Sequence, residues 1–141
     1  MINQDTAPFA ALVLRLTLGV MFVAHALLKI VVFTVPGTVQ FFESVGLPGF
    51  SAYLVIAAEL AAGALLIGGI ATRWVALATI PILLGAAWVH LPNGWVFNAQ
   101  GGGWEYPVFL AIAAFVQFLL GDGAYAMRSR PAPLATARAG R

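Results

Sequence analysis

Charged and imidazole side chains are rare in this sequence, and three of them interrupt one apolar stretch. Arg15, His25 and Lys29 lie within residues 9–33, where most other residues are apolar. At about 100° per residue, Arg15 and Lys29 fall on one helical stripe, and His25 lies beside it, one turn before Lys29. Each cation costs roughly 2.5–3.5 kcal/mol within a lipid-spanning helix, so such residues usually face a protein interior and a partner.

Two other apolar stretches carry groups that could serve as partners. Glu59 is the single charge within residues 52–71, and His90 lies near the end of residues 74–91. Counting about 1.5 Å per helical residue places Glu59 within reach of the long Arg15 side chain. We therefore predict an ion pair between Arg15 and Glu59. Such a pair could simply orient two helices or could take part in ligand or proton binding, and the sequence leaves both open.

We also predict a pocket for a small lipophile in the outer half of the helical bundle, lined by a second group of polar side chains. The predicted ligand-binding residues are His25, Lys29, Glu59 and His90. Phe22 and Trp88 are expected to supply apolar walls. Histidines that are merely solvated near the membrane surface are the alternative. Their spacing is too loose to argue for a metal, so no metal site is predicted, and no catalytic residue is assigned.

The composition indicates an integral membrane protein. Hydrophobic residues make up 62% of the 141 positions and charged residues 9%, whereas soluble domains have about 25% charged residues. Too little polar surface remains to cover a soluble fold of this size. The chain has no cysteine, which excludes disulfides and thiol chemistry of its own. A net charge of +2 does not indicate a nucleic-acid partner.

The predicted fold is an all-α integral membrane bundle of four transmembrane helices, within a single domain at residues 1–127. The spans are expected at about 9–33, 52–71, 74–91 and 106–120, with a tight turn at Thr72-Arg73. Residues 34–50 are too interrupted by proline and glycine to span. Val39, Phe42 and Val45 share a face there, which favours a short helix in the membrane interface. Residues 128–141 are expected to form a disordered basic tail.

The arginines predict the orientation of the bundle. Arg73 lies in the turn between the second and third spans, four arginines lie in the tail, and residues 34–50 and 91–104 contain no lysine or arginine. Basic residues stay on the cytoplasmic side of membranes. Both termini are therefore predicted to be cytoplasmic, with the two long connections on the outer side.

The chain resembles the DoxX family of small four-helix bacterial membrane proteins, from about Leu14 to Met127. The resemblance rests on these residues in this order: Arg15, Gly19, Phe22 and Lys29; Gly46-Leu47-Pro48; Glu59, Gly63 and Gly68; Thr72-Arg73; His90; Gly102-Gly103-Trp104-Glu105-Tyr106; and Gly121-Asp122-Gly123. His25 departs from the pattern, where a glycine is expected. The resemblance implies a location in the bacterial inner membrane.

The resemblance also implies an accessory or quinone-handling subunit of a membrane oxidoreductase, of the kind found in sulfur oxidation or oxidative-stress defence. A bound quinone would suit apolar walls with a few hydrogen-bonding groups, although no cofactor is evident from the residues themselves. The alternative is a non-enzymatic protein that binds or transports a small lipophile, or a membrane anchor for soluble partners. The sequence is compatible with oxidoreductase partner subunits and with a homo-oligomer.

Overall fold

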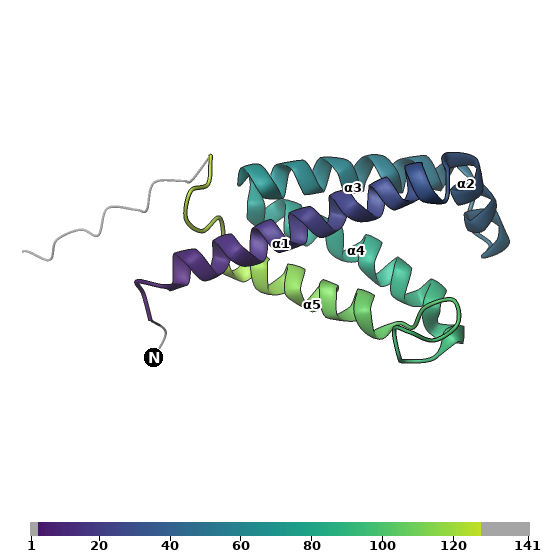
Figure 1. Ribbon diagram of the computed structural model, residues 1–141. Helices are drawn as coiled ribbons and strands as arrows, with labels where there is room; N and C mark the ends of the chain where they lie inside the picture. Colours follow the sequence, from purple (N-terminus) through teal and green to yellow (C-terminus); the bar gives the residue numbers. More distant parts are fainter. Residues whose placement is uncertain (1–2, 128–141) are drawn as a thin grey trace, which may run out of the picture.

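Residues 3–127, which the computed structural model describes, form five α-helices and no strand (Figure 1). The helices are α1 (Ala7–Leu27), α2 (Val35–Ser44), α3 (Phe50–Gly68), α4 (Thr72–His90) and α5 (Glu105–Leu120). A π-helical turn, Leu28–Val32, extends α1, and a 3₁₀ turn, Leu91–Asn93, extends α4. The all-helical fold predicted from the sequence is confirmed. The predicted tail at residues 128–141 lies outside the described residues.

Three of the helical segments are long and apolar enough to cross a membrane. They are Ala7–Val32, Phe50–Gly68 and Thr72–Asn93. The fourth apolar helix, α5, has 16 residues and spans about 24 Å. Each of the four stretches predicted as spans therefore forms a helix, and α2 forms in the interrupted region between the first two.

The turn between α3 and α4 lies earlier than the predicted Thr72-Arg73 turn. Gly69 adopts φ +69°, the Ile70 N–H donates to the Leu65 carbonyl at 2.9 Å, and the Gly69 N–H donates to the Leu66 carbonyl at 3.1 Å. This is a Schellman motif, which requires one residue in the left-handed conformation. Glycine adopts this conformation without strain. Thr72 already belongs to α4, so the predicted position was wrong because the stop signal is the glycine.

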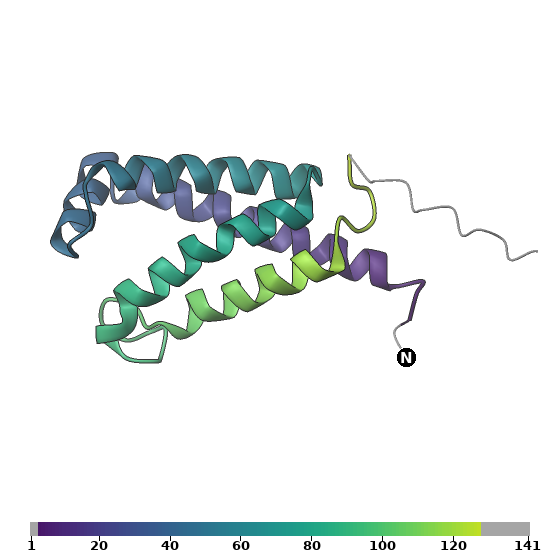
Figure 2. The same ribbon diagram turned by 180° about the vertical axis from the view of Figure 1, so that it is seen from behind.

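The helices pack as two antiparallel pairs, α1 with α3 and α4 with α5. Figures 1 and 2 show that the pairs converge at the turn after α3 and diverge towards α2. We call the end with residues 69–71 and 121–127 the narrow end, and the end with α2 and residues 91–104 the wide end. The buried apolar core joins the pairs away from the wide end. It comprises Leu18, Phe22, Leu66, Ala76, Leu83, Leu110, Ala111 and Ala114.

The segment after α5 closes the narrow end. The Ala124 N–H donates to the Pro8 carbonyl at 2.9 Å, and the Met127 N–H donates to the Gly68 carbonyl at 3.1 Å. Gly123 packs against the first turns of α1, where a Cβ would come within 2.7 Å of the Leu12 backbone nitrogen. Residues 121–127 therefore hold the ends of α1 and α3 together, whereas the wide end has no comparable backbone bridge between the two helix pairs among the described residues.

Candidate ligand-binding site

The register between α1 and α3 is set by two glycines. A Cβ on Gly63 would lie 2.8 Å from the Gly19 carbonyl oxygen, and a Cβ on Gly19 would lie 3.0 Å from that of Gly63. Small residues allow this approach of two backbones in lipid. One turn further along each helix, Val23 of α1 packs against Gly63, and Ile67 of α3 packs against Gly19.

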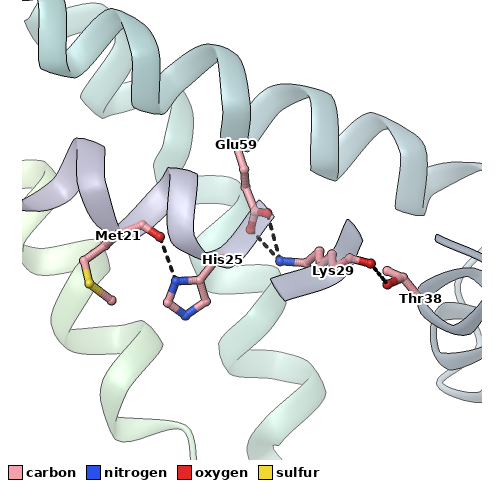
Figure 3. Close-up of polar contacts among 5 residues, drawn as sticks. All are labelled: Met21, His25, Lys29, Thr38 and Glu59. Carbon is pink, nitrogen blue, oxygen red and sulfur yellow. Dashed lines mark hydrogen bonds and ion pairs between the residues drawn. The ribbon is translucent and has the colours of Figure 1, made fainter. Parts of the chain in front are cut away.

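Glu59 forms an ion pair with Lys29. The Lys29 ammonium lies 2.8 Å from each carboxylate oxygen, and the side chains are 18% and 7% exposed, respectively. Lys29 lies in the π-helical turn, and the Thr38 hydroxyl of α2 donates to its carbonyl oxygen at 3.0 Å (Figure 3). π-Turns of this kind frequently occur at functional sites. Here the turn, α2 and α3 together hold one buried pair of charges.

The predicted pair between Arg15 and Glu59 is therefore wrong. Arg15 lies against Gly69, where a Cβ would collide with the Arg15 Nη1. Gly69 lies ten residues, or about 15 Å, along α3 from Glu59. Counting depth from the ends of the two apolar stretches missed this offset, because the glycine contact fixes the register. The carboxylate of Glu59 instead meets the flexible side chain of Lys29.

Arg15 belongs to the narrow end. It is 1% exposed, and its Nη2 donates to the Ala124 carbonyl at 3.2 Å. Asp122 attracts it electrostatically. Among the described residues, no hydrogen-bond acceptor meets its Nε and Nη1, and the buried Thr72 Oγ1 and Gln117 Oε1 also have no partner. Arg15 thus helps to attach the C-terminal segment and lies away from the Lys29–Glu59 pair.

His25 points from α1 towards α5. Its Nδ1 lies 2.8 Å from the Met21 carbonyl oxygen, and its ring stacks on Tyr106 with centroids 6.1 Å apart and planes 24° apart. A carbonyl can only accept a hydrogen bond, so Nδ1 carries a proton. In the neutral ring, Nε2 is then an acceptor that is available to a ligand.

His90 ends α4 beside a glycine-rich loop. Its Nδ1 lies 3.5 Å from the Asn93 Nδ2, and this amide also donates to the carbonyls of Gly101 and Gly102 at 2.9 Å. Glu105 at the start of α5 accepts the Phe97 N–H at 2.9 Å. The loop is thus held by side chains at both ends. Glu105 therefore stabilises the loop and does not line the cavity described next.

One cavity of about 920 Å³ lies between the two helix pairs at the wide end. The structure brings all four predicted ligand-binding residues, His25, Lys29, Glu59 and His90, to its wall. Phe22 lines it as predicted, whereas Trp88 does not and is 57% exposed. Most of the wall is apolar, and the two charged residues in it are the paired Lys29 and Glu59.

Sequence reasoning missed part of this wall. Tyr106, Thr38 and Phe97 line the cavity together with the glycines of residues 101–103. Phe42 of α2 and Val45, which follows this helix, also line it, although their shared face was assigned to the membrane surface. The apolar face of α2 was a usable signal, because it could also have indicated packing on the bundle. Nothing in the spacing of the loop glycines indicated that they turn back towards His90.

These features define a small helical membrane protein with a cavity between two helix pairs. The wall of the cavity is mostly apolar and carries a small cluster of polar groups. The sequence pattern of the DoxX family matches residues 10–91, more than half of the chain, and the chain therefore belongs to this family. A Bacillus subtilis (strain 168) protein named "Putative oxidoreductase CatD" is 44% identical over 75 residues, which are 53% of this chain and 54% of that protein. The chain thus matches about half the length of this curated relative. No solved structure matches it.

Proposed function

We propose that this protein is a quinone-binding subunit of a membrane oxidoreductase system. The observation that carries the proposal is the wide-end cavity, in which an apolar and aromatic wall meets a cluster of hydrogen-bonding groups. Ligand pockets typically combine apolar walls with a few polar groups that orient the ligand. The name of the Bacillus subtilis relative supports an association with oxidoreductases.

The residues of the cavity fit a quinone head group. The Lys29 ammonium has three N–H groups, and one remains for a ligand carbonyl when two donate to Glu59. The acceptor Nε2 of His25 suits a ligand hydroxyl, and Phe22 and Tyr106 suit an aromatic ring. A bound quinone would supply two-electron, two-proton redox chemistry. We propose that a partner subunit supplies the electrons.

The apolar majority of the wall also favours a second function, non-enzymatic binding or transport of a lipophile. A lipid carbonyl could use the same Lys29 N–H. Copurification from native membranes discriminates between the two, because a redox partner or a quinone should accompany the protein only under the first proposal. Copurification of lipid alone would favour the second function.

We further infer four membrane spans, with α5 as the fourth and α2 in the interface, in the bacterial inner membrane. Arg73 and four arginines of the tail support cytoplasmic termini, because basic residues concentrate on the cytoplasmic side of membranes. Alkaline phosphatase fused within residues 91–104 should then be active, and a fusion at the C-terminus should be inactive. An active C-terminal fusion would reject this orientation.

Quinone binding is tested by titrating the purified protein with a water-soluble, chainless quinone in calorimetry. Lys29→Met should weaken binding roughly 10- to 100-fold, because hydrogen bonds to charged groups contribute about 1.5–3 kcal/mol. His25→Phe should weaken it roughly fivefold, in line with one neutral hydrogen bond. Arg73→Met removes a cation that does not line the cavity and should leave the dissociation constant unchanged.

Equal affinity in all four proteins would remove the cavity as the site, and no binding by the wild type would reject quinone binding altogether. Circular dichroism of each variant checks that the helical fold is retained, so that lost binding is not mistaken for unfolding.

A further inference from the structure

The wide-end cavity reaches the outer surface of the bundle on the side of α3 and α4. On α3, Ser51, Val55 and Glu59 recur every four residues along the wall of the cavity, so they form one row. On α4, Pro81 and Gly85 line the cavity and are also exposed at the surface. The wall of the cavity therefore includes exposed residues of α4.

Gly85 lies on the side of α4 that lines the cavity. A Cβ placed on it would meet no atom within 4 Å, although the residue lies inside a 19-residue helix, five residues before its end. Figure 2 shows α3 and α4 in front, moving apart from their turn at the narrow end towards the wide end. We call the gap bordered by Val55, Pro81, Gly85 and Val89 the α3–α4 opening.

The opposite side of the cavity is bridged. There His25 of α1 stacks on Tyr106 of α5, which links the two helix pairs across the cavity. The α3–α4 opening is bordered by apolar side chains and a glycine, with Glu59 and its partner Lys29 further inside. In a membrane protein, such an opening faces hydrocarbon chains. Its chemistry selects an apolar chain, while the interior selects a polar head.

We propose that the ligand of the cavity is a quinone with a long isoprenoid chain, and that it enters from the bilayer through the α3–α4 opening. This inference rests on the proposed quinone binding and adds the class of quinone and its route. The ring lies at Lys29 and Glu59, and the chain leaves past Gly85 into the lipid. The absence of a side chain at Gly85 keeps this path open.

The test compares a radiolabelled long-chain quinone with the chainless ring, using the protein in lipid nanodiscs. Gly85→Trp should slow association of the long-chain quinone and weaken its binding by at least about tenfold, because the indole would occupy the space through which the chain passes. Binding of the chainless ring should change by less than about twofold. Ala78→Trp is the matched control, since Ala78 is exposed on the same helix but does not line the cavity. This control substitution should leave the binding of both quinones unchanged.

The outcomes separate the route from the function. If Gly85→Trp weakens both quinones equally, the tryptophan blocks the ring site itself, and the proposed route is rejected. Unchanged binding of the long-chain quinone would also reject it, while quinone binding as such would stand. If the wild type binds neither ligand, the proposed function fails first. Phospholipid retained in native mass spectrometry by the wild type, and lost in Gly85→Trp, would show that a lipid is the occupant and overturn the assignment to a quinone.

Discussion

The Lys29–Glu59 pair should contribute a measurable coupling energy to the stability of the bundle. At 2.8 Å, Coulomb's law with an effective dielectric constant of about 20 gives about 6 kcal/mol of attraction. Removal of both charges from water offsets much of this, and the 18% exposure of Lys29 lowers the gain further. We therefore expect a coupling energy of about 2 kcal/mol, within the range of about 0.5–3 kcal/mol for residues in contact.

A double-mutant cycle measures this energy. Lys29→Met and Glu59→Gln, singly and together, are unfolded reversibly by dodecyl sulfate in mixed micelles, and the free energies of unfolding are compared. Each single variant should lose about 2–3 kcal/mol, because it leaves a mostly buried charge without its counterion. The double variant should lose clearly less than the sum of the two.

A second cycle is the matched control, with Arg15→Met in place of Lys29→Met. Arg15 faces the narrow end, so its effect and that of Glu59→Gln should add within about 0.5 kcal/mol. Coupling below about 0.5 kcal/mol in the first cycle, or equal coupling in both cycles, would refute the assignment of Lys29 as the partner of Glu59.

Two further predictions concern glycines, and both are measured in the same unfolding assay. Gly63→Ala should destabilise the bundle by about 1–3 kcal/mol, because the Cβ would collide with α1; Gly85→Ala, whose Cβ meets no atom, should be neutral or stabilise by up to about 1 kcal/mol. Equal changes in the free energy of unfolding would show that backbone propensity, and not packing against α1, determines the effect of these substitutions. Gly69→Ala should cost more than Gly46→Ala: both have positive φ, but only a Cβ on Gly69 would meet Arg15. Equal losses would mean that the strain of about 1–2 kcal/mol is the whole effect.

The helices were predictable from the sequence, whereas their relative positions were not. Long apolar stretches separated by proline and glycine identify helices directly. The helical segment Ala7–Val32, which is α1 with its π-helical turn, begins and ends within three residues of the predicted bounds, and so do α3 and α4. The partner of Glu59 depends on how α1 slides along α3. That offset follows from the contact between Gly19 and Gly63, which no single helix encodes.

The four predicted cavity residues could be grouped because their positions along the helices were informative at low resolution. All four were predicted to lie in the outer half of the bundle, and they meet in one cavity. They are His25, Lys29, Glu59 and His90. The position of α2 could not be inferred in the same way. The face with Phe42 is equally suited to lipid and to a protein wall, and only the space left between the helix pairs decides between them.

That space follows from how the two ends of the bundle are held. At the narrow end, Gly123 and Gly69 let residues 121–127 lie against α1 and α3, and the buried Arg15 binds the Ala124 carbonyl. At the wide end the corresponding connections are long, and α2 and the 91–104 loop line the cavity without filling it. Because the helices are stiff, a closed narrow end and an unfilled wide end produce a wedge-shaped interior. The Lys29–Glu59 pair holds α1 to α3 along one wall of that wedge, so a ligand head can contact both charges without separating the helices that position them.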